Sequence, residues 1–334
     1  MHLFLFIKRL CSTALSLIAI SIAAYPQYSN PVMPKSAPDP CVLQAPDGYF
    51  YVYPTCNEMR MPVYRSKNLT SWEKAGTAFA ANATQRDLHD GNLWAPDVIY
   101  NRKQYVMAYA LSKNGEYHDN GIGIAVSKSP TGPFDNKGLL FTSYSSGVRN
   151  SIDPSLVTDG RNLYLLWGSF NGLYIVRLDY SSRKGYYIKD LAGKVQLAGT
   201  AFEGAHIFHH NGYYYLFASV GTCCQGMQST YHIGVGRSKS LFGQYLDKNG
   251  NRMLDNAYTL VVQGDRKFAG PGHGSEIITD DRGRTWYIYH SYVAGSTNGR
   301  QLMLDEIKWD ADGWPYIQSF VPSSNSSESP YFKK

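Results

Sequence analysis

The chain has 334 residues, of which 43% are hydrophobic and 17% charged, and its formal net charge is +6. This composition is typical of a soluble globular protein with a sizeable core, and the length allows one large domain or two ordinary ones. The 32 Lys and Arg residues are scattered and form no basic block. We therefore expect no nucleic-acid partner.

Residues 1–24 predict a secretory signal peptide. Lys8 and Arg9 precede an apolar run from Leu10 to Ala24, and the small residues near its end offer a cleavage site. An uncleaved membrane anchor is the alternative, because the run is only slightly short for a span. We expect a secreted or periplasmic protein with no stable membrane span after cleavage.

Four cysteines lie beyond the signal peptide, and export would place them in an oxidising compartment. Cys41 and Cys56 flank a predicted turn, so a disulfide between them is one alternative, although a regular hairpin need not place them opposite each other. Cys223 and Cys224 form either a vicinal disulfide or two thiols. The sequence leaves both states open, and no Cys/His spacing resembles a structural zinc site.

Five aromatic strands recur at intervals of roughly 50–70 residues, the range in which propeller blades repeat. They are GYFYVYPT from Gly48, QYVMAYALS from Gln104, NLYLLWGSF from Asn162, GYYYLFASVG from Gly212 and TWYIYHSY from Thr285. Each follows a turn, and Asp-Gly or Asn-Gly before an alternating run is a hairpin signal. The repeat predicts an all-β fold, a five-bladed β-propeller over residues 30–320, followed by a polar tail at 321–334 that we expect to be disordered. A β-sandwich or a β-helix is the alternative.

A shorter strand precedes each turn, and in a propeller this innermost strand lines the central channel. Aligned on their turns, these strands begin at Asp39, Ala95, Asp153, Glu203 and His273. Equivalent positions of different blades converge at one mouth of the channel, so we expect three carboxylates and an imidazole around one cavity. Taken singly, each Asp-Pro is more typical of a turn cap, but recurrence at one repeat position indicates a functional site.

Three converging carboxylates raise one another's pKa and suit either a metal or acid/base chemistry. Glycoside hydrolysis needs one carboxyl group that stays protonated for the leaving oxygen and one that stays ionised to activate water. A third carboxyl group can keep the pKa of the acid raised and position it. The 27 Tyr residues and Trp94 suit the apolar faces of sugar rings.

Six segments of the chain together match the pattern of a known family: PDPCVLQAPDGYFYVYPT, LWAPDVIYNRKQYVMAYA, SIDPSLVTDG, FEGAHIFHHNGYYYLF, CCQGMQSTYHIGVGRS and GPGHGSEI. They resemble glycoside hydrolase family 43, a family of inverting five-bladed propeller enzymes. The resemblance implies that Asp39 is the general base, Asp153 the modulator of the acid's pKa and Glu203 the general acid. In an inverting enzyme the carboxyl groups of base and acid lie roughly 6.5–9.5 Å apart. The resemblance departs at Ala205, where the family has proline, and we expect at most a local change there.

The segments CCQGMQSTYHIGVGRSKSLFGQYLDKNG and NGRQLMLDEIKWDADGWP look most like the arabinanase branch of the family. That branch cleaves α-1,5-linked L-arabinofuranosyl bonds in arabinan, a side chain of pectin. An α-L-arabinofuranosidase or β-xylosidase on the same scaffold, and a carbohydrate-binding propeller without catalysis, are the alternatives. We expect a monomer, and the sequence does not distinguish endo from exo action.

The resemblance also implies a metal site at His273. In the arabinanase branch the histidine of a matching GPGH segment binds calcium or a similar ion at the propeller centre. Calcium usually prefers oxygen ligands, and a hydrogen bond from His273 to Asp153 or to the backbone is the alternative.

Four further residues are expected to contact the substrate. Trp94 precedes the channel position of the second unit and is expected to wall a sugar subsite. Asn150 and Ser169 flank the strand of Asp153 and are expected to bond sugar hydroxyls. His290 ends the fifth aromatic strand and is expected to reach the site.

Overall fold

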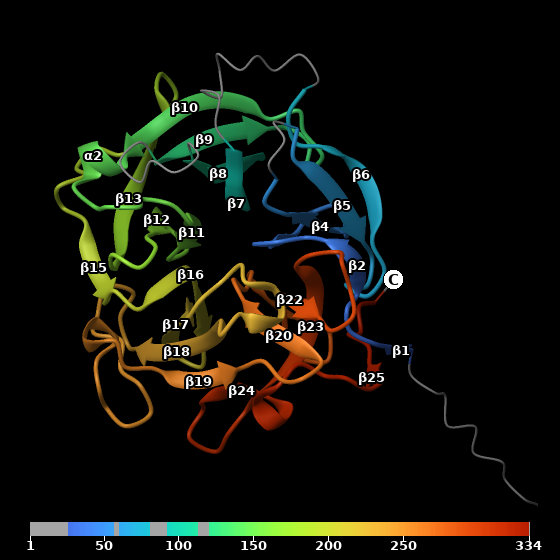
Figure 1. The fold of residues 1–334 in the computed structure, drawn as a ribbon. Coiled ribbons are helices and arrows are strands. Elements are labelled where there is room, and N and C mark those ends of the chain that lie inside the picture. Colours follow the sequence, from blue (N-terminus) through green and yellow to red (C-terminus); the bar gives the residue numbers. More distant parts are fainter. Residues whose placement is uncertain (1–25, 57–59, 81–91, 113–119, 334) are drawn as a thin grey trace, which may run out of the picture.

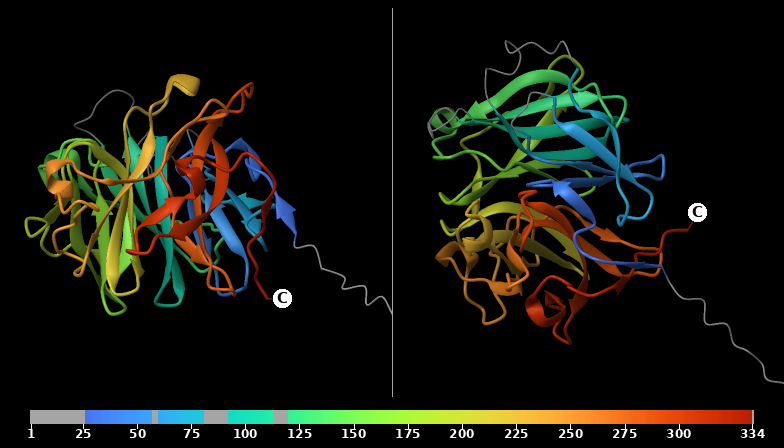
Figure 2. Two further views of the ribbon diagram at one scale, coloured as in Figure 1. Left: turned by 90° about the horizontal axis from the view of Figure 1, so that it is seen from below. Right: turned by 45° about the vertical axis from the view of Figure 1, so that its right-hand side comes forward.

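The computed structural model describes residues 26–56, 60–80, 92–112 and 120–333, so the predicted signal peptide lies outside the described residues. Five β-sheets stand radially around one axis (Figure 1), and their strands run along that axis (Figure 2). The predicted five-bladed β-propeller is confirmed. In these residues, helical structure is confined to α2 (Ser143–Ser146) and the 3-10 turns η1 (Gly226–Gln228), η2 (Met253–Asp255) and η3 (Gln318–Phe320).

The first four blades are antiparallel sheets whose innermost strand comes first in the chain. Blade 1 contains β3 (Cys41–Gln44), β4 (Phe50–Tyr53), β5 (Pro62–Ser66) and β6 (Glu73–Thr77). Blade 2 contains β7 (Asn92–Asn101), β8 (Gln104–Ser112), β9 (Gly121–Ser127) and β10 (Asp135–Thr142). Blade 3 contains β11 (Ser155–Thr158), β12 (Leu163–Trp167), β13 (Leu173–Ser181), β14 (Gly185–Tyr187) and β15 (Val195–Ala198). Blade 4 contains β16 (Phe202–His210), β17 (Tyr213–Val220), β18 (His232–Ser238) and β19 (Thr259–Val262).

Blade 5 joins the two ends of the chain. Its inner edge is formed by β20 (Phe268–Gly272) and β21 (Ile277–Thr279), followed by β22 (Thr285–Val293), β23 (Gln301–Trp309) and β24 (Pro315–Ile317). The N-terminal strand β2 (Met33–Ser36) also pairs with β23 and so closes the ring. In every blade the second strand is the aromatic strand that the repeat predicts.

The C-terminal tail is ordered, contrary to expectation. Strand β25 (Ser327–Glu328) pairs with β1 (Gln27–Tyr28), and the ring of Phe332 packs on that of Phe50 with centroids 4.6 Å apart. A polar composition alone predicts disorder, but the strand pairing of β25 and the packing of the partly buried Phe332 ring anchor this tail.

The hydrophobic core is divided among the five blade interfaces. Each of five buried clusters draws its side chains from two successive blades, and the last cluster joins blade 5 to blade 1. Trp167 of blade 3, for example, meets Phe141 of blade 2 with ring centroids 4.9 Å apart. Each sheet is covered on both faces, which explains why the aromatic strands read as nearly continuous apolar runs.

One residue at the channel mouth of each blade, at or near the start of its inner strand, has a left-handed backbone conformation. These residues are Asp39 (φ 47°), Ala95 (φ 40°), Asp153 (φ 57°), Gly204 (φ 53°) and His273 (φ 46°). The expected alignment is therefore wrong by one residue in blade 4, where Gly204 and not Glu203 is the equivalent position. Glu203 pairs with Ser219 just before a bulge, as Trp94 pairs with Ala110. Alignment on the turns misses this offset because the hairpin loops differ in length.

Side chains of the preceding blade hold four of these left-handed residues. The acceptors are His290 Nδ1 for the amide of Asp39 (3.0 Å), Thr55 Oγ1 for Ala95 (2.7 Å), Asp153 Oδ2 for Gly204 (3.1 Å) and Ser219 Oγ for His273 (2.8 Å). A non-glycine residue in this conformation costs roughly 1–2 kcal/mol, and these bonds between blades offset that cost. They also fix where each inner strand begins at the mouth of the channel.

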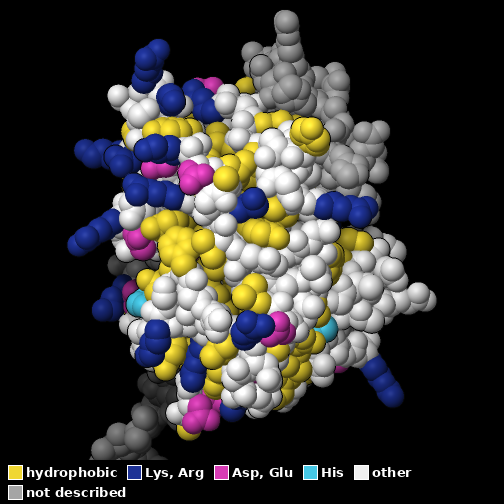
Figure 3. Space-filling view, turned by 90° about the vertical axis from the view of Figure 1, so that its left-hand side faces the viewer, with side chains coloured by type: hydrophobic (Ala, Val, Ile, Leu, Met, Phe, Trp, Pro, Cys, Tyr) yellow, Lys and Arg dark blue, Asp and Glu magenta, His cyan; other side chains and the backbone are white. Residues whose placement is uncertain are grey.

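On the face drawn in Figure 3, the Lys and Arg side chains stand apart or beside acidic ones, with apolar side chains between them. No continuous basic groove forms on that face. No helix among the described residues is long and apolar enough to cross a membrane.

Candidate active site

A cleft of about 1220 Å³ lies over one mouth of the channel. Every blade contributes to its lining, which includes Asp39, Trp94, Asn150, Asp153, Ser169, Glu203, His273 and Arg300. The three acids and the imidazole selected from the sequence therefore meet around one cavity.

Asp39 lies in a positively charged environment. Arg300 Nη1 is 2.5 Å from Asp39 Oδ1, and His273 Nδ1 is 3.4 Å from the same oxygen. Burial alone would raise the pKa of this carboxyl group, but the Arg300 guanidinium beside it holds that pKa well below its usual range. Asp39 is therefore ionised at neutral pH and can accept a proton from water.

Glu203 faces hydroxyl groups at both carboxyl oxygens. Ser169 Oγ donates to Oε2 at 2.6 Å, and Tyr231 Oη donates to Oε1 at 2.7 Å. Asn150 Nδ2 donates to Ser169 Oγ at 3.0 Å, which leaves the Ser169 proton to point at Glu203. Burial raises the pKa of Glu203 above its usual value, although the two hydroxyls favour the ionised form. Glu203 thus keeps its proton to a higher pH than an exposed glutamate.

Asp153 is buried beside Glu203. Its Oδ2 accepts the amide of Gly204, the residue that follows the predicted acid, at 3.1 Å. Burial, and then repulsion by Glu203 and Asp39, raises the pKa of Asp153 well above its usual value. Two interacting buried carboxyl groups titrate as a pair. Asp153 therefore orients the backbone beside Glu203 and couples the protonation of Glu203 to its own.

His273 faces Asp39, and the bond to Asp153 that was one form of the alternative to a metal site is not among the hydrogen bonds of the described residues. Only glycine fits between Glu203 and this imidazole, because a Cβ on Gly204 would lie 2.8 Å from His273 Nδ1 and the backbone there is left-handed. The described residues contain no group of three or more His, Cys, Asp or Glu side chains that could hold a metal ion. A cation bound at His273 would therefore have to take most of its ligands from water.

Of the four expected substrate contacts, one is open to the cleft and three support the carboxyl groups. Trp94 is half-buried and lines the cleft, open to a sugar. Asn150 and Ser169 also line it, but Asn150 donates to Ser169 and Ser169 donates to Glu203, so the pair orients the acid. His290 is fully buried and behind Asp39, where it holds the amide of that residue. Burial depresses the pKa of His290 well below its usual value, so its ring supports Asp39 as a neutral acceptor and does not reach the cleft.

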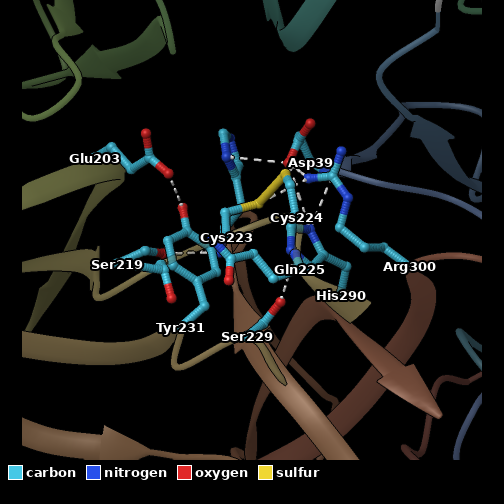
Figure 4. The surroundings of a disulfide bond; sticks show 12 residues. Asp39, Glu203, Ser219, Cys223, Cys224, Gln225, Ser229, Tyr231, His290 and Arg300 are labelled. Atoms are coloured by element: carbon cyan, nitrogen blue, oxygen red, sulfur yellow. Dashed lines mark hydrogen bonds and ion pairs between the residues drawn. A yellow bond between two sulfur atoms is a disulfide. The ribbon is translucent and has the colours of Figure 1, made fainter. Parts of the chain in front are cut away.

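No disulfide joins Cys41 and Cys56. Cys41 instead lies between blades, and its Sγ accepts the amide of Val98 at 3.1 Å. Cys223 and Cys224 form a vicinal disulfide at the edge of the cleft. Figure 4 shows Glu203 on one side of this disulfide and Asp39 with Arg300 on the other.

Two important side chains carry no signal in the repeat. Arg300 comes from the loop between β22 and β23, and Tyr231 from the residue before β18. Both lie outside the positions on which the sequence comparison of the blades depends. Arg300 and Tyr231 do fall inside the two segments that resemble the arabinanase branch, which was the one available clue.

Asp39 and Glu203 thus face one cleft with opposite protonation preferences, and no hydrogen bond or ion pair joins them in the described part of the chain. An ionised base and a protonated acid that flank a cleft with an aromatic wall suit the hydrolysis of a glycosidic bond. The fold and the site together define a glycoside hydrolase.

The sequence profile of glycosyl hydrolases family 43 matches residues 28–315, and the chain belongs to this family. The extracellular endo-alpha-(1->5)-L-arabinanase 1 of Bacillus subtilis is 36% identical over 67% of this chain and 68% of its own length. The extracellular exo-alpha-(1->5)-L-arabinofuranosidase ArbA of Cellvibrio japonicus is 32% identical over 76% of this chain and 79% of its own. The structure of Cellvibrio cellulosa alpha-L-arabinanase complexed with arabinohexaose superposes with a TM-score of 0.75 at 28% identity, over 86% of this chain and 99% of that one.

Proposed function

We propose that this protein hydrolyses α-1,5-linked L-arabinofuranosyl bonds of arabinan with inversion of configuration. The observation that carries the proposal is the contrast between Asp39, held ionised by Arg300, and Glu203, whose pKa is raised by burial. The arabinan-degrading relatives and the arabinohexaose complex support the choice of substrate. Asp39 acts as general base, Glu203 as general acid and Asp153 as modulator of the acid's pKa.

In this mechanism the sugar occupies the cleft between the two carboxyl groups. Asp39 takes a proton from a water molecule, whose oxygen attacks the anomeric carbon. Glu203 gives its proton to the glycosidic oxygen as the bond from that oxygen to the anomeric carbon breaks. Attack opposite the leaving group inverts the anomeric centre, and the water needs the separation of roughly 6.5–9.5 Å between carboxyl groups that inverting enzymes have.

The product profile on linear arabinan tests the proposal. We infer endo action, as in the name of the Bacillus relative, so early samples should contain a range of oligosaccharides. A single short product from the start would indicate exo action. Aryl arabinofuranoside or aryl xyloside as the preferred substrate would favour the alternative glycosidases, and no hydrolysis of any of them would favour a binding propeller. NMR of the first-formed sugar reports the anomeric configuration, and retention would contradict the mechanism.

We also infer that the protein is exported and acts as a monomer. The names of both relatives describe extracellular proteins, and residues 1–24 have the pattern of a signal peptide. One chain supplies all five blades and the lining of the cleft, so the site needs no second copy.

The role of Asp153 predicts a specific change in the pH profile. In the wild type the last proton of the pair is lost at a raised pKa, because its loss leaves two adjacent charges. Asp153→Asn removes one charge and can still accept the amide of Gly204, so Glu203 should lose its proton at a lower pH. We expect the alkaline limb of the pH profile of kcat to move to lower pH. An unmoved limb in a folded variant would contradict the role given to Asp153.

A hydrated calcium or similar ion at His273 remains a proposal from the family resemblance. If His273 holds such an ion, a chelator should lower the thermal midpoint of the wild type by a few degrees, since a ligand bound only to the native state stabilises it. His273→Ala should remove this sensitivity, whereas His209→Ala, at an exposed histidine, should retain it. A wild-type midpoint that chelation does not move would refute the ion site.

A further inference from the structure

We propose that the Cys223–Cys224 disulfide is a specificity-determining contact for the furanose ring held beside Asp39. This inference rests on the proposed hydrolysis of arabinan and names one more part of the same cleft. Both cysteines line the cleft, together with Thr222 and Gln225. Figure 4 shows the disulfide between the predicted base and the predicted acid.

The disulfide lies next to the predicted base. Arg300 Nη1 is 3.7 Å from Cys223 Sγ and 2.5 Å from Asp39 Oδ1, so one guanidinium nitrogen touches both the sulfur and the carboxylate. A sugar placed for attack by the water that Asp39 activates would therefore lie against the disulfide. Cys224 is exposed and Cys223 half-buried, so the sulfur edge is open to the cleft.

The loop that carries the disulfide is firmly held at its base. Thr222 Oγ1 and Thr230 Oγ1 are 2.8 Å apart, and the amide of Gln225 donates to Ser229 Oγ at 2.9 Å. Beneath the loop, a Cβ on Gly270 would lie 2.7 Å from Ser229 Cβ, so β20 packs directly against it. These contacts give the disulfide a fixed position before substrate binds.

The chemistry of the disulfide differs from that of its neighbours. Asp39, Arg300, His273 and Glu203 are all charged or polar, whereas two bonded sulfur atoms form an apolar, polarisable surface without a strong donor. A furanose ring has hydroxyl groups that form hydrogen bonds and C–H edges that pack against apolar surfaces. The disulfide suits contact with a C–H edge. Reduction separates the sulfurs beyond the bond length of about 2.05 Å and breaks this surface.

Kinetics with and without reduction test this inference. Dithiothreitol supplies two electrons and two protons to the disulfide and closes to its own cyclic disulfide. We expect reduction to raise KM for linear arabinan about tenfold, equivalent to about 1.4 kcal/mol, with kcat within about twofold and an unchanged pH profile. Titration of two additional thiols confirms that the bond has opened.

Two variants separate the disulfide from other effects of the reductant. Cys223→Ala/Cys224→Ala should show the raised KM without dithiothreitol and no further change with it. Met227→Ala, at an exposed position of the same loop outside the cleft lining, should behave as the wild type in both conditions. Thermal midpoints measured on all forms show whether any loss comes from unfolding.

The outcomes distinguish this inference from the proposed function. An unchanged KM in fully reduced enzyme overturns the inference alone, as does a loss confined to kcat or accompanied by a matching fall in thermal midpoint. A wild type that leaves arabinan intact and cleaves an aryl xyloside overturns both the proposed substrate and the furanose contact. A raised KM that appears only when the disulfide is open supports the contact.

Discussion

Replacement of Glu203 by alanine is expected to reduce turnover of arabinan by roughly a hundred- to ten-thousand-fold, the usual contribution of a general acid. The loss should depend on the leaving group, because a sugar alkoxide needs the proton and an activated phenol scarcely does. Aryl arabinofuranosides of falling phenol pKa should therefore recover progressively more activity in Glu203→Ala.

The comparison of two substrates in one variant provides the internal control for this prediction. Glu73→Ala, at an exposed acid far from the cleft lining, should leave both rates unchanged. A Glu203→Ala enzyme with full activity on arabinan would refute the assignment of the acid. An equal loss on every substrate would instead assign Glu203 a role in water activation or binding.

Asp39→Ala should also remove most of the turnover, but equally on every substrate, because water must be activated whatever group leaves. General base assistance is worth roughly a hundred- to ten-thousand-fold. The substitution also leaves the half-buried guanidinium of Arg300 without the carboxylate that it contacts at 2.5 Å. The isosteric Asp39→Asn separates catalysis from stability, since it keeps the shape and an acceptor for Arg300 but cannot take a proton.

This prediction is tested by measuring rates on arabinan and on one activated aryl substrate. The thermal midpoint of each variant is measured alongside. Asp312→Ala, which removes an exposed aspartate, serves as the matched control. A folded Asp39→Asn enzyme with near wild-type turnover would contradict the role of general base. If the Asp39 variants recovered activity only on the activated substrate, Asp39 would be the general acid and Glu203 the base.

The amino-acid sequence by itself determined the number of blades and which three acids meet at the cleft. Both depend on local patterns repeated along the chain: aromatic strands after hairpin turns, and an acid at or beside the start of an inner strand. In a ring of similar blades such positions must converge, so remote residues such as Asp39 and Glu203 can be placed together without knowledge of the packing.

Only the tertiary structure showed the alignment position of Glu203, the side chains that contact the three acids, and the order of the C-terminal tail. A bulge follows Glu203 in β16 as one follows Trp94 in β7, so Glu203 corresponds to Trp94 and not to Ala95, and hairpins of unequal length conceal this offset of one residue. Arg300 and Tyr231 reach the acids from loops that follow no repeat, and the environment of each carboxyl group depends on them. The position of His290 behind Asp39, and of Phe332 against Phe50, likewise arises from packing between segments far apart in sequence, which no local pattern encodes.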